Sequence, residues 1–176
     1  MKQIVILLVL SMSFHAYGQS QKSPTLKSIL LEQLRTTHNQ KDWFVPANIA
    51  VAGLTAEQAS WMDGHGNHSI GQLANHLIFW NQQALATFKG EKPAQFSGDN
   101  NETFNSFDSK KWAATVQQVD EVLTAWEKAV EAADDKKLEA SASTIAHIGV
   151  HNAYHIGQIV YVRKLQGSWD PERGVK

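Results

Sequence analysis

Apolar residues recur every three or four positions in several long stretches of the chain. The clearest repeat alternates spacings of four and three, at Trp112, Val116, Val119, Leu123, Trp126 and Val130. Because 3.6 residues make one helical turn, this spacing places the side chains on one face of a helix. We predict a helix here that is capped by Asp108 or Ser109 and ends at residues 133–137.

Three other segments combine helical spacing with start and stop signals. The first predicted helix is 24–38, with Ser23 as N-cap and Pro24 in the first position. The second begins at the capping box Ser69–Gln72 and ends at Lys89, before Gly90. The third is Ile145–Leu165, which follows an N-cap at Ser141 or Ser143 and ends before Gly167. A second capping box, Thr55–Gln58, predicts a short helix that ends near Trp61. No strand-like alternation persists anywhere, so the pattern favours an all-α fold, a four-helix bundle.

The segment 91–108 is predicted to be a long loop. It is rich in Asn, Gly, Ser and Asp, and it carries Phe96, Phe104 and Phe107 as anchors. A long loop in a compact domain often covers a functional site. The alternative is a surface excursion held down by its aromatic residues, and the sequence does not decide between the two.

Histidine recurs at every fourth residue of the predicted helix Ile145–Leu165, as His147, His151 and His155. Residues four apart lie one above the other on a helix, and apolar flanking residues predict that this stripe points inward. A buried imidazole must be hydrogen-bonded or bind a metal ion. The HxxxH pair of His151 and His155 can hold one divalent ion, as the two histidines of HExxH do. Because such a pair also occurs by chance, a third ligand is needed.

His76 is the candidate for that third ligand. It lies on the apolar stripe of the helix that ends at Lys89. Alone, it would be interpreted as a structural histidine bonded to a backbone carbonyl or to water. Two more inward-facing histidines reverse that interpretation, because Zn²⁺ in catalytic sites is often held by three imidazoles.

The beginning of the chain has the features of a secretory signal peptide. Residues 1–18 contain Lys2, the apolar run Ile4–Leu10 and the small residues Ala16 and Gly18 at cleavage positions. We expect one domain over residues 19–176, exported to the periplasm or secreted. The chain has no cysteine, which excludes a thiolate metal ligand and a lipoprotein anchor, so no stable membrane anchor is expected after cleavage.

Composition narrows the class of partner. Hydrophobic residues make up 43% of the chain and charged residues 19%, which is ordinary for a globular protein. The formal net charge is −1 and no basic patch or stripe appears. Nucleic acid is therefore not an expected partner.

Several segments together resemble the DinB-like (YfiT-like) family of metalloenzymes, which is unrelated to the DNA polymerase of similar name. They are Asp42–Pro46, Gly53–Ala59, His68–Leu73 with His76, Leu77, Phe79 and Trp80, and His151–Ile159 with its His-x-Gly-Gln ending. The resemblance covers about residues 24–166. It implies an up-down-down-up four-helix bundle, often a homodimer, with a divalent metal held by His76, His151 and His155.

The resemblance leaves His147 without a family role. It is interpreted first as a residue that supports the ligands, and a substitute ligand or a core residue are the less favoured alternatives. Gln72, one turn before His76, and Gln158, three residues after His155, are candidates to hydrogen-bond the second ring nitrogens of the ligands. Three imidazoles suit zinc or nickel first, with iron or manganese as alternatives.

The leading hypothesis is a metal-dependent enzyme, either a hydrolase or a thiol-dependent transferase, acting on a small molecule that the sequence does not identify. An open position on the ion would serve hydroxide or thiolate attack. Asp63, Glu102 and Asp108 lie in loops that could contact the site, and none is favoured as a general base. The alternatives are a non-catalytic metal-binding or stress-associated helical module, and an interaction protein with merely structural histidines.

Overall fold

The computed structural model describes residues 23–175, and within that range the chain is all-helical with no strand. The predicted signal peptide, residues 1–18, lies outside the described residues. The helices are α1 (Leu26–His38), α2 (Ala47–Val51), α3 (Ala56–Ser60), α4 (Ile70–Lys89), α5 (Asn101–Asn105), α6 (Trp112–Ala132) and α7 (Asp135–Leu165), with short 3₁₀ turns at η1 (Ser109–Lys111) and η2 (Pro171–Arg173). Among the described residues, none of these helices has the length and apolar character needed to cross a membrane.

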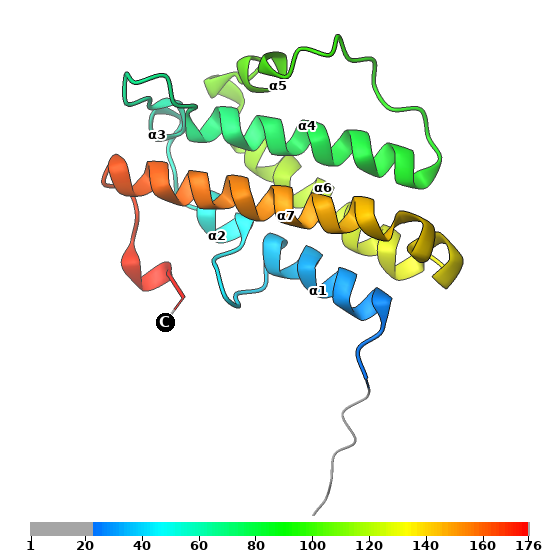
Figure 1. Ribbon diagram of the computed structural model, residues 1–176. Coiled ribbons are helices and arrows are strands. Elements are labelled where there is room, and N and C mark those ends of the chain that lie inside the picture. The colour runs from blue at the N-terminus through cyan, green and yellow to red at the C-terminus, as the bar shows by residue number, and fades with distance from the viewer. Residues whose placement is uncertain (1–22, 176) are drawn as a thin grey trace, which may run out of the picture.

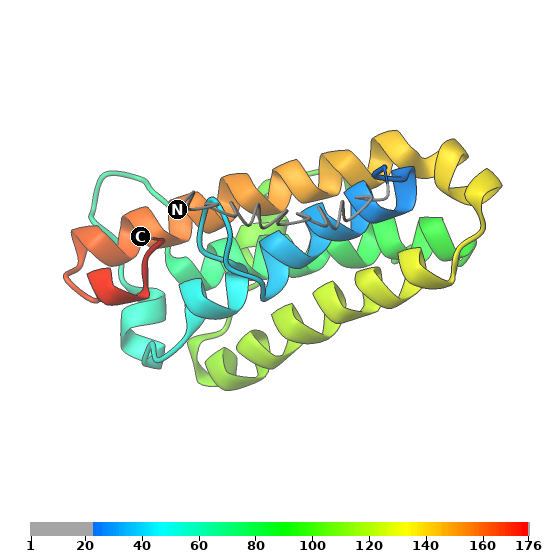
Figure 2. The same ribbon diagram turned by 90° about the horizontal axis from the view of Figure 1, so that it is seen from below.

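The long helices α1, α4, α6 and α7 form the body of the protein. Helices α1 and α4 each pack against both α6 and α7, so the helices surround a common core (Figure 1). Figures 1 and 2 show that α1 and α7 run in one direction and that α4 and α6 run in the opposite direction. The short helix α5 lies on α4, on the side away from α1.

Local capping explains where the helices begin, and it corrects three predicted starts. The capping boxes at Thr55 and Ser69 form as predicted, and Gly90 ends α4 with a positive φ of 79°. Helix α1 begins instead at Leu26, because the Thr25 hydroxyl accepts a hydrogen bond from the Ser28 N–H in a box that Ser23 does not make. Asp108 caps η1, and α6 itself begins only at Trp112.

The histidine-bearing helix α7 begins at Asp135, ten residues before Ile145, where the predicted helix began. Its N-cap is Asp134, whose carboxylate accepts a hydrogen bond from the Lys137 N–H. The residues between this cap and the predicted caps are mostly good helix formers, so the helix continues through Ser141 and Ser143 without a break. As predicted, Gly167 has left-handed backbone just beyond its C-terminal end.

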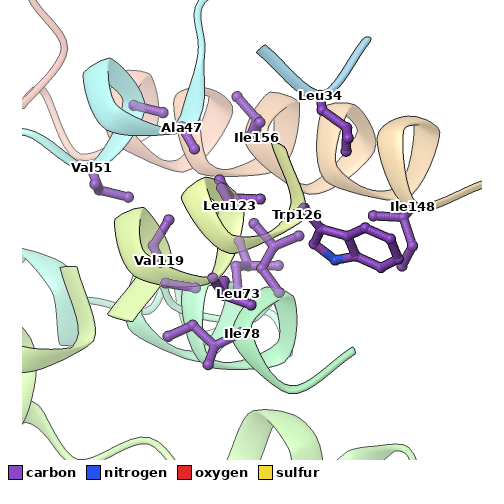
Figure 3. Close-up of a cluster of buried hydrophobic side chains, with 14 of the residues drawn as sticks. Leu34, Ala47, Val51, Leu73, Ile78, Val119, Leu123, Trp126, Ile148 and Ile156 are labelled. Carbon is purple, nitrogen blue, oxygen red and sulfur yellow. The ribbon is translucent and has the colours of Figure 1, made fainter. Parts of the chain in front are cut away.

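The core is apolar, and Trp126 of α6 is the largest completely buried side chain among the described residues. Figure 3 shows buried apolar side chains of this core from α1 (Leu34), α4 (Leu73, Ile78), α6 (Val119, Leu123) and α7 (Ile148, Ile156). The indole N–H of Trp126 donates to the main-chain oxygen of Asn81 at 3.2 Å, so its one polar group is satisfied. This packing holds α4, α6 and α7 at fixed relative positions.

A buried arginine joins the end of α7 to α2. One amino group of Arg163 (Nη1) donates to the carbonyl oxygens of Ala50 (2.8 Å) and Ala52 (3.0 Å), and Nη2 donates to Ser168 O (2.9 Å). The last carbonyls of a helix have no partner within it, and a cation at this end also interacts favourably with the helix dipole. Arg163 therefore fixes the segment that leads from α2 toward α3 and the site.

Candidate metal centre

Three imidazole rings, from His76 of α4 and from His151 and His155 of α7, meet at one place in the protein. One ligand atom from each lies within 4.8 Å of the others. The ring centroids are 4.5 Å apart for His151 and His155, 4.6 Å for His76 and His155, and 5.1 Å for His76 and His151. His76 and His155 are only 4% and 7% exposed, and His151 is half-buried. The tertiary fold thus brings together the three histidines that the sequence singled out.

A threonine from α5 sets the tautomer of His76. The Thr103 hydroxyl lies 2.6 Å from His76 Nδ1 and donates its own hydrogen to the main-chain oxygen of Asn100 at 2.7 Å. A hydroxyl that has used its hydrogen can only accept, so Nδ1 of His76 must carry the proton. The lone pair of His76 is then on Nε2, which faces His151 Nε2 at 3.1 Å.

Gln158 does the same for His155. Its side-chain carbonyl Oε1 lies 2.6 Å from His155 Nδ1 and can only accept, so the ring donates from Nδ1 and keeps its lone pair on Nε2. His151 has no such partner, and its Nδ1 is buried without a hydrogen bond. Two nitrogens that each lie about 2.1 Å from one tetrahedral ion are about 3.4 Å apart, close to the 3.1 Å found here. The donor set therefore fits a divalent metal ion.

The surroundings keep the imidazoles uncharged. Burial lowers the pKa of His76 to about 3, with further contributions from positive charge on His155, His151 and His68. Burial, followed by the neighbouring His155, lowers the pKa of His151 to about 4. Burial also lowers the pKa of His155, although its hydrogen bond with Gln158 acts in the opposite direction. Neutral imidazole is the form that binds a metal ion, so protons do not compete for these nitrogens at pH 7.

Helix α5 belongs to the segment predicted as a loop, and it forms one wall of the site. Phe104 is stacked between two imidazoles, with ring centroids 4.0 Å from His76 and 3.8 Å from His68. Two nearly parallel rings at such distances must occupy opposite faces of the phenyl ring. This part of the segment therefore lies against the histidine cluster, and its aromatic residues also hold it to α4.

Two side chains of α4, and the space beside one of its glycines, hold α5 in place. Asn75 Nδ2 donates to Thr103 O and Ser106 Oγ, both at 2.7 Å, and Trp80 Nε1 donates to Asn100 Oδ1 at 3.1 Å. Phe107 packs directly against Gly71, whose missing side chain leaves room for the ring. Sequence reasoning missed Thr103 because a threonine in a polar segment has no periodicity that would mark it.

Gln72 and His147, the other predicted neighbours of the metal ligands, do not hydrogen-bond the ligand histidines. Gln72 lies one turn before His76 as expected, but its Oε1 accepts from the Ser69 N–H in the capping box of α4, and Thr103 is the hydrogen-bond partner of His76. His147 is exposed, so its interpretation as a core residue is wrong. Four residues advance a helix by slightly more than one turn, so the stripe rotates from buried His155 through half-buried His151 to exposed His147.

A recess of about 460 Å³ opens beside the cluster. His76 and His151 line it together with Trp80, Asn100, Thr144, His147 and Ile148. The three loop acids lie elsewhere: Asp63 borders a different pocket, Glu102 accepts a hydrogen bond from Ser97, and Asp108 caps η1. No carboxylate, lysine or arginine is among the described residues that line the recess.

The fold and the site define a class: an all-helical protein in which the second and fourth long helices contribute a buried group of three histidines. The family model of the DinB superfamily matches residues 47–159, a range that includes all three. The chain belongs to the DinB superfamily. Comparison with curated proteins found no match, and neither did comparison with solved structures.

Proposed function

We propose that this protein is a divalent-metal-dependent hydrolase whose ion, zinc or nickel, is held by His76, His151 and His155. The observation that carries the proposal is the pair of fixed tautomers, because Thr103 and Gln158 hold protons on Nδ1 and leave the Nε2 lone pairs directed into the cluster. A bound divalent ion lowers the pKa of a coordinated water to about 7 and so supplies a nucleophile at neutral pH.

The residues of this chain would then hold the ligands and admit the substrate. Phe104 covers one side of the cluster, and the recess beside His76 and His151 gives access from another. Hydrolysis bonds a water oxygen to an acyl carbon, breaks the bond from that carbon to its leaving oxygen or nitrogen, and transfers a water proton to the leaving atom. His147 is the one side chain lining the recess, other than His76 and His151, that can carry this proton.

The recess favours hydrolysis over thiol transfer. Most low-molecular-weight thiols carry carboxylates, and the lining residues include no lysine or arginine to pair with them. A non-catalytic metal-binding module remains the second candidate, because a module of this kind would need the same three imidazoles and no substrate.

Metal analysis of the protein purified without a histidine tag tests the proposal. We expect about one equivalent of zinc or nickel per chain, lost in His151→Ala and retained in His65→Ala, which changes an exposed loop histidine. Hydrolysis of p-nitrophenyl acetate should disappear with a chelator and return with the metal. Bound metal without any hydrolytic activity supports the binding module instead, and absence of bound metal rejects both.

We also propose that the chain forms the up-down-down-up four-helix bundle of its superfamily, which the opposed directions of α1 and α7 relative to α4 and α6 support. Export and a homodimeric state are further proposals. N-terminal sequencing of the mature protein and light scattering would test them.

A further inference from the structure

The recess beside the histidine cluster has a distinct composition. Its walls beyond His76 and His151 are the indole of Trp80, the aliphatic side chain of Ile148, and the polar groups of Asn100, Thr144 and His147. It combines apolar surface with neutral hydrogen-bonding groups, and it has no carboxylate, lysine or arginine among the described residues that form it.

Asn100 is held in one orientation. Its Oδ1 accepts a hydrogen bond from Trp80 Nε1 at 3.1 Å, and its main-chain oxygen accepts from the Thr103 hydroxyl at 2.7 Å. With the oxygen engaged, the Nδ2 group is the part of the amide that remains to donate. Asn100 therefore offers a positioned N–H donor at the edge of the metal centre.

The apolar wall is also fixed. The Trp80 ring makes edge-to-face contacts with Phe79 and Phe96 at centroid distances of 5.2 and 5.5 Å, and with His76 at 6.4 Å. Because these contacts already fix the Trp80 ring, little side-chain freedom is lost when a ligand binds. The entropic cost of binding is therefore lower. Thr144 and His147, which also line the recess, are three residues apart on α7 and share one face of it.

We infer that the recess binds an uncharged acyl compound, an amide or ester with an apolar group, as the substrate of the proposed hydrolase. The apolar group packs against Trp80 and Ile148, and the carbonyl oxygen accepts a hydrogen bond from Asn100 Nδ2. This arrangement turns the acyl carbon toward His76 and His151. Apart from the proposed ion, an anionic compound of the same size would lose hydration without gaining a cationic side chain as a partner. The claim that the compound is hydrolysed rests on the proposed function. The preference for neutral compounds rests on the recess alone.

Fluorine NMR of the 5-fluorotryptophan-labelled protein tests the inference. The probes are N-acetylphenylalaninamide and N-acetylphenylalanine, which differ in carrying a carboxamide or a carboxylate. We expect the neutral amide to shift the Trp80 resonance saturably and to bind about fivefold or more tightly than the anion. Measuring the protein both as purified and after treatment with a chelator separates this preference from direct attraction of the carboxylate to a bound ion.

Variants locate the binding and provide the controls. Trp80→Phe identifies the resonance, and the exposed Trp43, which borders a different pocket, should not respond. Asn100→Ala should weaken binding of the amide several-fold, whereas Asn105→Ala, an exposed asparagine of α5, should leave it unchanged. Equal affinity for the two probes, or a response confined to Trp43, would overturn the inference.

Metal content and ester hydrolysis measured on the same preparations keep the two proposals apart. A protein that binds zinc and hydrolyses esters but shows no preference for the neutral probe retains the proposed function and rejects this inference. A protein with the preference but without metal or hydrolysis retains the recess as a binding site for neutral compounds and rejects the proposed function.

Discussion

Asn81 of α4 and Asn152 of α7 face each other in the core and exchange hydrogen bonds between their side-chain amides. Asn81 Nδ2 donates to Asn152 Oδ1 at 2.7 Å, and Asn152 Nδ2 donates to Asn81 Oδ1 at 3.3 Å. Both residues are completely buried. Buried polar groups need partners, and sliding one helix along the other would break both bonds, leaving Asn81 only the hydrogen bond from its Nδ2 to Leu77 O. Because Asn152 directly follows His151, this pair sets the register in which His151 meets His76.

We predict that Asn152→Leu destabilises the protein by about 1–3 kcal/mol, because the buried Asn81 Oδ1 loses the hydrogen bond from Asn152 Nδ2. Urea unfolding followed by circular dichroism measures the change. Asn48→Leu, at an exposed position of α2, is the control and should change stability by no more than about 0.5 kcal/mol. A similarly small effect of both substitutions would show that the amide pair does not hold the helices in register.

Gly71→Ala should weaken the attachment of α5. A Cβ at residue 71 would lie 2.1 Å from Cζ of Phe107, so the ring and its segment must move. Gly157→Ala is a matched control on α7, where a Cβ would meet nothing within 4 Å. We expect Gly157→Ala to raise the free energy of unfolding by about 0.5–1 kcal/mol, and Gly71→Ala to lower both stability and metal affinity. Denaturation and zinc titration check both, and parallel behaviour of the two variants would contradict the prediction.

Thr103→Val keeps the shape of the side chain and removes the acceptor for His76 Nδ1. Loss of such a partner from a metal ligand lowers metal affinity about 10–100-fold. Calorimetric titration with zinc measures this change, and Thr103→Ser should restore most of the affinity. Thr87→Val, which alters an exposed threonine at the far end of α4, is the control. Unchanged affinity in Thr103→Val would mean that the hydroxyl does not orient the ring.

The metal-free protein should lose stability as the pH falls below about 6.5. The pKa of His76 is lowered to about 3 and that of His151 to about 4, so between these values and 6.5 the unfolded chain binds protons that the folded chain does not. Each such proton lowers the free energy of unfolding by about 1.4 kcal/mol per pH unit. Above pH 6.5 both states are neutral and this contribution is flat.

Urea unfolding from pH 8 to pH 4 measures this dependence. His151→Gln should reduce the slope below pH 6.5, because one of the histidines whose lowered pKa causes it is gone. His65→Gln, in an exposed loop, should leave the slope as it is. A wild-type profile without any loss of stability between pH 6.5 and pH 4 would contradict the lowered pKa values.

Features that depend on neighbouring residues were predictable from the sequence. The capping boxes at Thr55 and Ser69, the end of α4 at Gly90 and the apolar face of α6 all follow from hydrogen bonds or spacing within one turn or one helix. The predicted N-cap Ser23 was wrong, because Thr25 and Ser28 make the reciprocal hydrogen bonds that cap α1. The candidate histidines were found because helical spacing marks inward-facing positions.

Only the tertiary structure determined what surrounds those histidines. Thr103 and Phe104 come from a short helix that has no amphipathic repeat, and they lie at the site because Asn75, Trp80 and the space beside Gly71 hold that helix on α4. His147 continues the spacing of His151 and His155 but turns outward, because a helix with 3.6 residues per turn rotates a four-residue stripe. The sequence by itself determines which residues share a helix face, whereas contacts between distant segments determine what each face meets.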